Sequence, residues 1–162
     1  HRNIGYVGNC RNEDRYNGYL DTLKRNNLDV IPEYVVETNQ TEKEGYEAME
    51  QFLKSDDCPT GIYCANDITA VGMLKYLGRC RNLYFTPSII ASDDIEEAQY
   101  TKPMLTTVGL PKEEMGKFAL YLLLDRMKGG HSGVVRMELS GHLMIRNSCS
   151  HVSESTWSDY CI

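Results

Sequence analysis

The chain has 162 residues, of which 41% are hydrophobic and 25% are charged, and its formal net charge is −6. This length and apolar content suit one ordinary domain with a hydrophobic core. The acidic balance argues against a surface that binds duplex DNA, because neutralising phosphates needs clustered Lys and Arg, and the basic residues here are dispersed among more numerous acidic ones.

The cysteine pattern predicts reduced thiols, with no disulfide framework and no metal site. The six cysteines form no Cys-x-x-Cys pair, and several lie in apolar runs, where a thiol behaves as a small hydrophobic group. Cys149 and Cys161, with His151 between them, do not have the spacing of a structural zinc site, so a polar tail is favoured there. We therefore expect a protein without metal or cofactor.

The sequence also gives no indication of a membrane partner. No apolar run reaches the roughly 18 residues that cross a bilayer. The N-terminus lacks the basic and then apolar layout of a signal peptide. A cytoplasmic location is the resulting prediction.

The first half of the chain alternates short apolar runs with segments of helical period. Residues 4–7 predict a buried strand, and the apolar spacing from Glu13 onward predicts a helix that stops near residues 26–27. A second strand is expected at residues 34–36. Thr41 and Glu44 then have the spacing of a capping box, which predicts the start of a second helix that includes Leu53.

The second half continues this alternation. Strands are expected at residues 61–64, 88–91 and 105–108, with helices at 68–77 and 95–100. Pro111 starts a long helix that runs to Met127, and residues 134–139 and 142–145 predict a final strand pair. The predicted fold class is α/β, with three layers in which a mostly parallel sheet has helices on both faces.

The pattern divides the chain into one lobe at residues 1–108, a crossover helix at 109–130, final strands at 131–148 and a polar tail at 149–162. The long helix carries apolar side chains at helical spacing but no evident partner sheet. So large an apolar face should not remain in water. We expect it to pack against a second copy of the chain or to fold back onto the lobe.

Polar residues follow three of the predicted strands. Arg15 follows the first, Asn66 the third and Asp93 the fourth, and ligands of parallel sheets bind at these carboxyl ends. Sugar hydroxyls both donate and accept hydrogen bonds, and planar Asn, Asp and Arg groups can engage two at once. A sugar or polyol site is predicted, whereas Asp67 is expected to cap the third helix and Asp94 to be a cap or surface residue.

Four motifs in this order resemble the effector-binding core of the LacI/GalR family of bacterial transcription regulators. They are residues 15–19 (Arg-Tyr-Asn-Gly-Tyr), 65–67 (Ala-Asn-Asp), 91–94 (Ala-Ser-Asp-Asp) and 103–108 (Pro-Met-Leu-Thr-Thr-Val), and the resemblance runs from about His1 to Ser148. It implies one lobe of a periplasmic-binding-protein-like core. It also implies that Arg15 anchors the effector, that Asn66 contributes to binding it and that Asp93 completes the set of hydrogen-bonding residues around it.

Two further positions follow from the resemblance with less support in the sequence. Arg11 lies four residues before Arg15, and Gln40 stands where relatives often have an aromatic residue that stacks on a sugar. Ser92 also replaces the family's aromatic residue, so less apolar surface is offered to a sugar ring. The effector can therefore differ from a common hexose.

The resemblance implies a sensor for a small sugar-like effector that works as a homodimer. DNA binding would require an N-terminal helix-turn-helix, which is absent from this chain. A periplasmic sugar-binding protein of an uptake system is the alternative, because it shares the fold. An enzyme is not expected, since the sequence has no P-loop, no G-x-S-x-G and no H-E-x-x-H.

Overall fold

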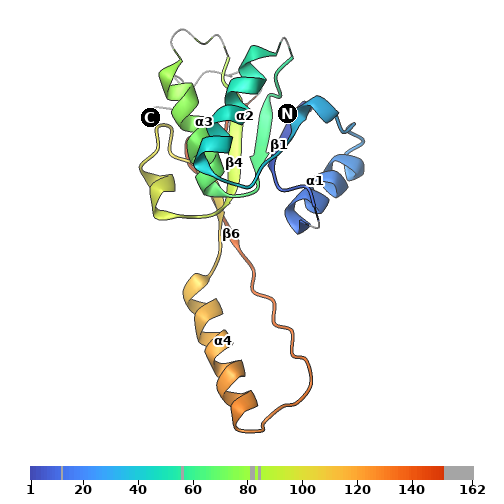
Figure 1. The fold of residues 1–162 in the computed structure, drawn as a ribbon, viewed down its shortest axis with the longest axis vertical. Helices are drawn as coiled ribbons and strands as arrows, with labels where there is room; N and C mark the ends of the chain where they lie inside the picture. The colour runs from blue at the N-terminus through green and yellow to red at the C-terminus, as the bar shows by residue number, and fades with distance from the viewer. Residues whose placement is uncertain (12, 56, 81–82, 84, 152–162) are drawn as a thin grey trace.

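The computed structural model describes residues 1–11, 13–55, 57–80, 83 and 85–151. Its centre is a six-stranded sheet in the order β2-β1-β3-β4-β5-β6 (Figure 1). The first five strands are parallel, and β6 pairs antiparallel with β5. The strands are β1 (Ile4–Gly8), β2 (Val35–Glu37), β3 (Gly61–Cys64), β4 (Ser88–Asp93), β5 (Thr106–Gly109) and β6 (His142–Met144).

Helices cover both faces of this sheet. Buried residues of α1 pack with Tyr6 of β1 on one face, and the buried residues of α2 and α3 pack with Val7 and Ile62 on the other. The predicted three-layer α/β fold with a mostly parallel sheet is thus confirmed. The helices are α1 (Asp14–Arg25), α2 (Glu42–Lys54), α3 (Asp67–Arg79) and α4 (Lys112–Met127), with short 3-10 turns η1 (Pro32–Tyr34) and η2 (Glu96–Gln99).

Helix α2 begins with the capping box that the sequence predicted. The Thr41 hydroxyl accepts a hydrogen bond from the backbone N–H of Glu44, and the Glu44 carboxylate accepts one from the backbone N–H of Thr41. Each bond satisfies an N–H group that the first helical turn would otherwise leave unpaired. Hydrogen bonds from the Thr41 hydroxyl and from Asn39 lower the pKa of the Glu44 carboxyl to about 2.

Replacing Thr41 by alanine should lower the free energy of unfolding by about 1 kcal/mol, the usual cost of losing an N-cap side chain. Urea denaturation at pH 7 measures this change. The depressed pKa of Glu44 gives a control by pH. The ionised Glu44 carboxylate contributes fully to stability above the ordinary pKa of about 4.3, and this contribution is lost as pH falls towards 2. The difference between the two proteins should therefore shrink over that interval. An equal difference at both ends would contradict this account.

Helix α3 begins differently from the prediction. Asn66 is its N-cap, because the Asn66 side-chain oxygen Oδ1 accepts a hydrogen bond from the backbone N–H of Thr69. The expectation that Asp67 caps this helix is therefore wrong. Asp67 is fully buried, and its carboxylate accepts hydrogen bonds from the Thr107 hydroxyl and from the backbone N–H of Ile95.

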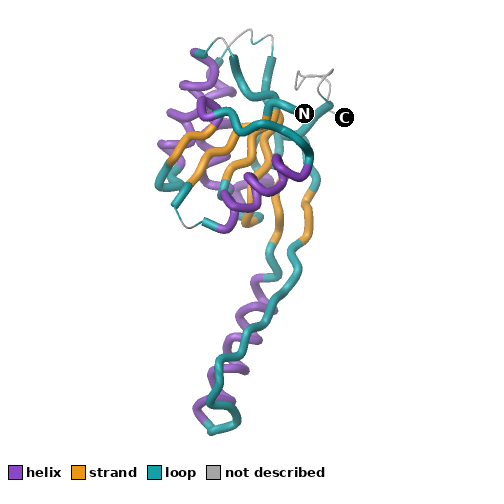
Figure 2. The backbone as a smooth tube through the Cα atoms, turned by 90° about the vertical axis from the view of Figure 1, so that its right-hand side faces the viewer, coloured by secondary structure: helices purple, strands orange, loops and turns teal. Residues whose placement is uncertain are grey.

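Beyond β5, the chain leaves the lobe and returns to it, forming an arm at residues 110–141. Helix α4 makes up its outward half, and the return segment runs beside the helix in both views (Figures 1 and 2). No residue of α4 is buried. Of the two expected arrangements, folding back onto its own lobe is wrong, because the connections at both ends direct the arm away from the sheet; packing against a second copy stays a prediction.

The prediction that residues 134–139 pair with residues 142–145 is also wrong. Residues 134–139 have no regular secondary structure, whereas β6 adds to the edge of the sheet beside β5, with Thr107 opposite Met144. Hydrogen bonding to an existing strand satisfies the backbone groups of β6. The tail that the sequence predicted from residue 149 lies outside the described residues from 152 onward. None of the helices that the structure describes is long and apolar enough to cross a membrane.

Candidate functional site

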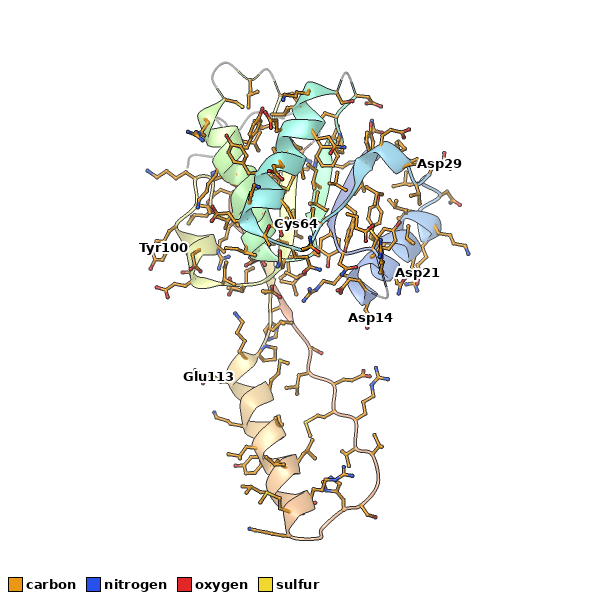
Figure 3. The ribbon with its side chains drawn as sticks, in the orientation of Figure 1. Asp14, Asp21, Asp29, Cys64, Tyr100 and Glu113 are labelled. Carbon is orange, nitrogen blue, oxygen red and sulfur yellow. The ribbon has the colours of Figure 1, made fainter. Side chains whose placement is uncertain are left out.

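The carboxyl ends of the parallel strands meet at the edge of the lobe from which the arm leaves. Asp14 lies at the end of α1 that faces the arm, and Glu113 lies at the end of α4 that faces the lobe (Figure 3). The predicted ligand residues lie at the carboxyl end of a strand or in the segment after it. This is the position where open parallel sheets bind their ligands.

Arg15 and Asp93 form the centre of the candidate site. The Arg15 Nη2 atom lies 3.3 Å from the Asp93 Oδ1 atom, and the two side chains are 34% and 29% exposed. Arg15 is in the first turn of α1, and Asp93 is the last residue of β4. The structure therefore joins two residues that are 78 positions apart in the sequence.

The environment of Asp93 is unfavourable to its charge. Burial raises the pKa of the Asp93 carboxyl above its usual range, and the nearby Asp67 carboxylate raises it further, while Arg15 and Lys112 oppose this rise. The backbone of Asp93 also has a φ of 135°. Such a conformation costs about 1–3 kcal/mol in a residue other than glycine. A carboxyl with a perturbed pKa and a strained backbone both cost folding free energy, and such features are typical of binding sites.

Replacing Asp93 by asparagine should stabilise the chain slightly at pH 7. Because the pKa is raised in the folded state, folding binds the proton more tightly, so the ionised carboxylate costs stability above that pKa. Asparagine has no such charge. We expect thermal unfolding at pH 7 to shift upward by about 1–2 °C, a small change because the carboxyl is partly solvated. Below pH of about 3.5 the two proteins should unfold alike, and a downward shift at pH 7 would contradict the argument.

Asn66 and Gln40 form a second contact at the same edge. The Asn66 Nδ2 group donates a hydrogen bond to the Gln40 carbonyl oxygen at 3.2 Å, and Gln40 has a φ of 62°. The Asn66 side chain therefore holds the backbone of the loop after β2 with its Nδ2 group while its Oδ1 atom caps α3. The Gln40 side-chain amide makes no hydrogen bond with the residues that the structure describes.

Arg11 is not brought to the Arg15–Asp93 pair. Its Nε atom lies 3.0 Å from the Glu37 Oε1 atom at the end of β2, and its side chain is 84% exposed. Because its ion pair is with Glu37 and not with Asp93, the contribution of Arg11 to the ligand site stays a prediction. Arg11 is an exposed rim residue.

The sequence interpretation missed two cations beside the site. Arg146 forms a mostly buried ion pair with Asp94, and the Lys112 ammonium group donates a hydrogen bond to the Asp94 carbonyl oxygen. Asp94 is therefore more than the cap or surface residue that we expected. Arg146 could not be assigned from spacing, because its position depends on the pairing of β6 with β5.

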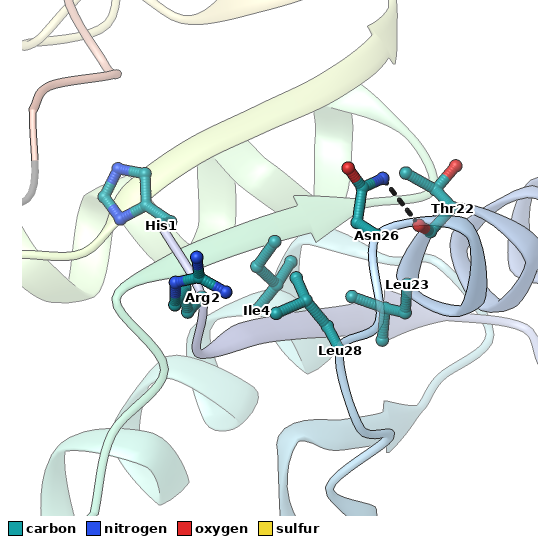
Figure 4. Close-up of a pocket in the computed structure, with 7 residues that line it drawn as sticks. All are labelled: His1, Arg2, Ile4, Thr22, Leu23, Asn26 and Leu28. Carbon is teal, nitrogen blue, oxygen red and sulfur yellow. Dashed lines mark hydrogen bonds between the residues drawn. The ribbon is translucent and has the colours of Figure 1, made fainter.

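The described residues also form cavities away from the Arg15–Asp93 pair. A cavity of about 520 Å³ lies beside the start of β1 and the end of α1, lined by Ile4, Leu23 and Leu28 among others (Figure 4). This cavity lies near the amino end of β1, whereas Asp93 lies at the carboxyl end of β4. Within the part of the chain that the structure describes, no three His, Cys, Asp or Glu residues are grouped to hold a metal ion. Cys161 lies outside that part.

Comparison with known proteins identifies relatives of this chain. It is 36% identical to the HTH-type transcriptional repressor CytR of Escherichia coli (strain K12) over 136 residues, which cover 83% of this chain and 40% of CytR. It is 30% identical to the HTH-type transcriptional repressor PurR of Haemophilus influenzae (strain PittGG) over 160 residues, or 94% of this chain and 48% of PurR. The chain thus spans less than half the length of these relatives.

Solved structures agree with this relationship. The structure of a complex between the transcriptional regulator CelR and cellobiose matches with a TM-score of 0.82 and 27% identity, over 92% of this chain and 47% of that chain. The family model of the periplasmic binding protein-like domain matches residues 1–149. The chain therefore belongs to the LacI/GalR family of transcription regulators, in which it corresponds to part of the periplasmic-binding-protein-like effector-binding core.

Proposed function

We propose that this chain is the effector-sensing part of a LacI-type transcription regulator and that its effector is a sugar or related polyol. The observation that carries the proposal is the Arg15–Asp93 pair at the carboxyl edge. The carboxylate can accept hydrogen bonds from two neighbouring hydroxyls while the guanidinium donates to a ring or hydroxyl oxygen. CelR, to which this chain is similar, forms a complex with cellobiose.

The effector would bind between this lobe and the second lobe of a complete core. Binding there would change the angle between the two parts of a complete core, and with it the separation of DNA-binding segments that lie elsewhere in the protein. Such a regulator would act in the cytoplasm. A periplasmic sugar-binding protein shares the fold, but CytR and PurR are both repressors, which favours the regulator.

A second copy of the chain is the proposed partner. Helix α4 exposes a series of large apolar side chains, each between 37% and 74% accessible: Met115, Phe118, Leu120, Tyr121, Leu123, Leu124 and Met127. Covering such a surface is favourable at about 25 cal/mol per Å² of apolar area. Light scattering of this 18.5 kDa chain should therefore give twice its mass. A monomer at micromolar concentration would overturn the homodimer.

A thermal-shift screen of the full-length protein tests the effector class. The panel contains pentoses, hexoses, disaccharides, sugar alcohols, nucleosides and free nucleobases. A ligand that binds only the folded state at 100 times its Kd stabilises by about 2.7 kcal/mol, which is a readily measured shift. We expect stabilisation by compounds that carry neighbouring hydroxyls. Stabilisation only by compounds without hydroxyls would overturn the proposal.

A further inference from the structure

The turn that follows β4 has an uncommon backbone. Asp93 has a φ of 135° and Asp94 a φ of 49°, so two successive residues other than glycine lie at positive φ. Residues keep such conformations only where several neighbours hold them in place. The contacts of Asp94 show which parts of the molecule do so.

One side of the turn is anchored to the core of the lobe. The backbone N–H of Asp94 donates to the Thr107 hydroxyl at 3.3 Å, and that hydroxyl donates to the buried Asp67 carboxylate at 2.5 Å. The next backbone N–H, of Ile95, donates to the other oxygen of Asp67 at 3.0 Å. The turn is therefore tied to β5 and to the start of α3.

The other side of the turn contacts Lys112 at the start of the arm and Arg146 just after β6, the strand by which the chain returns to the lobe. The Arg146 Nη2 atom lies 2.6 Å from the Asp94 Oδ1 atom, and the side chains are only 11% and 22% exposed. Arg146 also donates from Nη1 to the Leu105 carbonyl oxygen at 2.9 Å, which fixes the plane of its guanidinium group. Lys112, the first residue of α4, donates from Nζ to the Asp94 carbonyl oxygen at 2.9 Å.

We infer that Asp94 is a positioning residue that couples the Asp93 turn to the direction in which the arm leaves the lobe. Lys112 begins α4 at the start of the arm, and Arg146 lies just after β6, where the chain has returned to the lobe. Both hold the same residue, directly beside the carboxylate that the proposed function assigns to the effector. The inference rests on that proposed function for its biological meaning.

This arrangement makes the coupling reciprocal. A ligand that moves the Asp93 carboxylate shifts the Asp94 backbone, and the ion pair and the lysine contact carry the shift to the end of β6 and to the start of α4. An arm held at one angle equally favours one conformation of the turn. The contact with Lys112 links Asp94 to the arm itself, because Lys112 belongs to α4, a helix with no residue in the core of the lobe.

The test measures the arm directly and needs no effector. Residual dipolar couplings of the ¹⁵N-labelled 162-residue chain report how well α4 shares the alignment of the sheet. We expect one common alignment in the unchanged chain. Asp94→Ala and Lys112→Met should each reduce the alignment of α4 about twofold relative to the sheet, and Asp94→Ala should speed amide exchange at Ile95 about tenfold.

Two further variants distinguish a specific loss of α4 orientation from a general loss of stability. Asp94→Asn keeps an oxygen acceptor for Arg146 and a side chain that tolerates positive φ, so it should restore most of the alignment. Arg136→Ala removes an exposed ion pair with Glu138 in the return segment and should change nothing. Lys112→Met alters only an exposed side chain, so it remains informative if Asp94→Ala does not fold.

An unchanged alignment of α4 in Lys112→Met and in a folded Asp94→Ala would overturn the inference. So would independent alignment of α4 in the unchanged chain. Because no ligand is present, these outcomes are separate from a failure of Asp93 to bind the effector, which the screen and the binding measurements detect.

Discussion

Replacing Asp93 by alanine should weaken effector binding by about 100-fold or more. The carboxylate is the only acceptor-only group of the central pair, and each hydrogen bond from a hydroxyl to a charged group contributes about 1.5–3 kcal/mol. Losing two such bonds corresponds to a factor of about 10² to 10⁴. Isothermal titration of the full-length protein with the polyol identified by the screen measures the change. Arg15→Ala should also lower the affinity for the effector.

Asp14→Ala is the matched control for this substitution. Asp14 is an exposed carboxylate in the first turn of α1, next to Arg15 in the chain and near the same edge of the lobe (Figure 3). Removing it changes the local charge equally but takes away no member of the pair, so the affinity should change less than about threefold. An undiminished affinity in both Asp93→Ala and Arg15→Ala would remove the basis of the proposed site.

Most of the lobe was predictable because its local signals and its tertiary structure agree. The capping box at Thr41 and the helical spacing after Glu13 both gave helices at the expected places. The meeting of Arg15 and Asp93 was predictable for a different reason: parallel strands place all their carboxyl ends at one edge. A rule of topology therefore connected residues that no local pattern relates.

The errors occur where a choice between partners depends on distant contacts. Asn66 and Asp67 are both good N-caps, and the burial of Asp67 against Thr107 decided between them. Residues 134–139 have the composition of a strand, but β5 was a better partner for β6. The network around Asp94 was missed for the same reason, since Arg146 reaches it only through that pairing.

Replacing Gly72 by alanine should lower the free energy of unfolding by about 3 kcal/mol, although alanine usually stabilises a helix interior by about 0.5–1 kcal/mol. A Cβ atom at Gly72 in α3 would overlap the carbonyl oxygen of Glu42 in α2, and one at Gly45 in α2 would overlap the carbonyl oxygen of Thr69 in α3. The helices cross with their backbones in contact. An added methyl group must separate them and so loosen the core around Met49, which is fully buried.

The same change at Gly18 provides the control. Gly18 lies inside α1, and a Cβ atom there would meet nothing within 4 Å. Gly18→Ala should therefore raise the melting temperature by about 2 °C, whereas Gly72→Ala should lower it by about 6–12 °C. Circular dichroism at 222 nm follows both transitions. Shifts of the same sign and size would mean that helix propensity alone controls these positions, and the close crossing of α2 and α3 would then have no energetic importance.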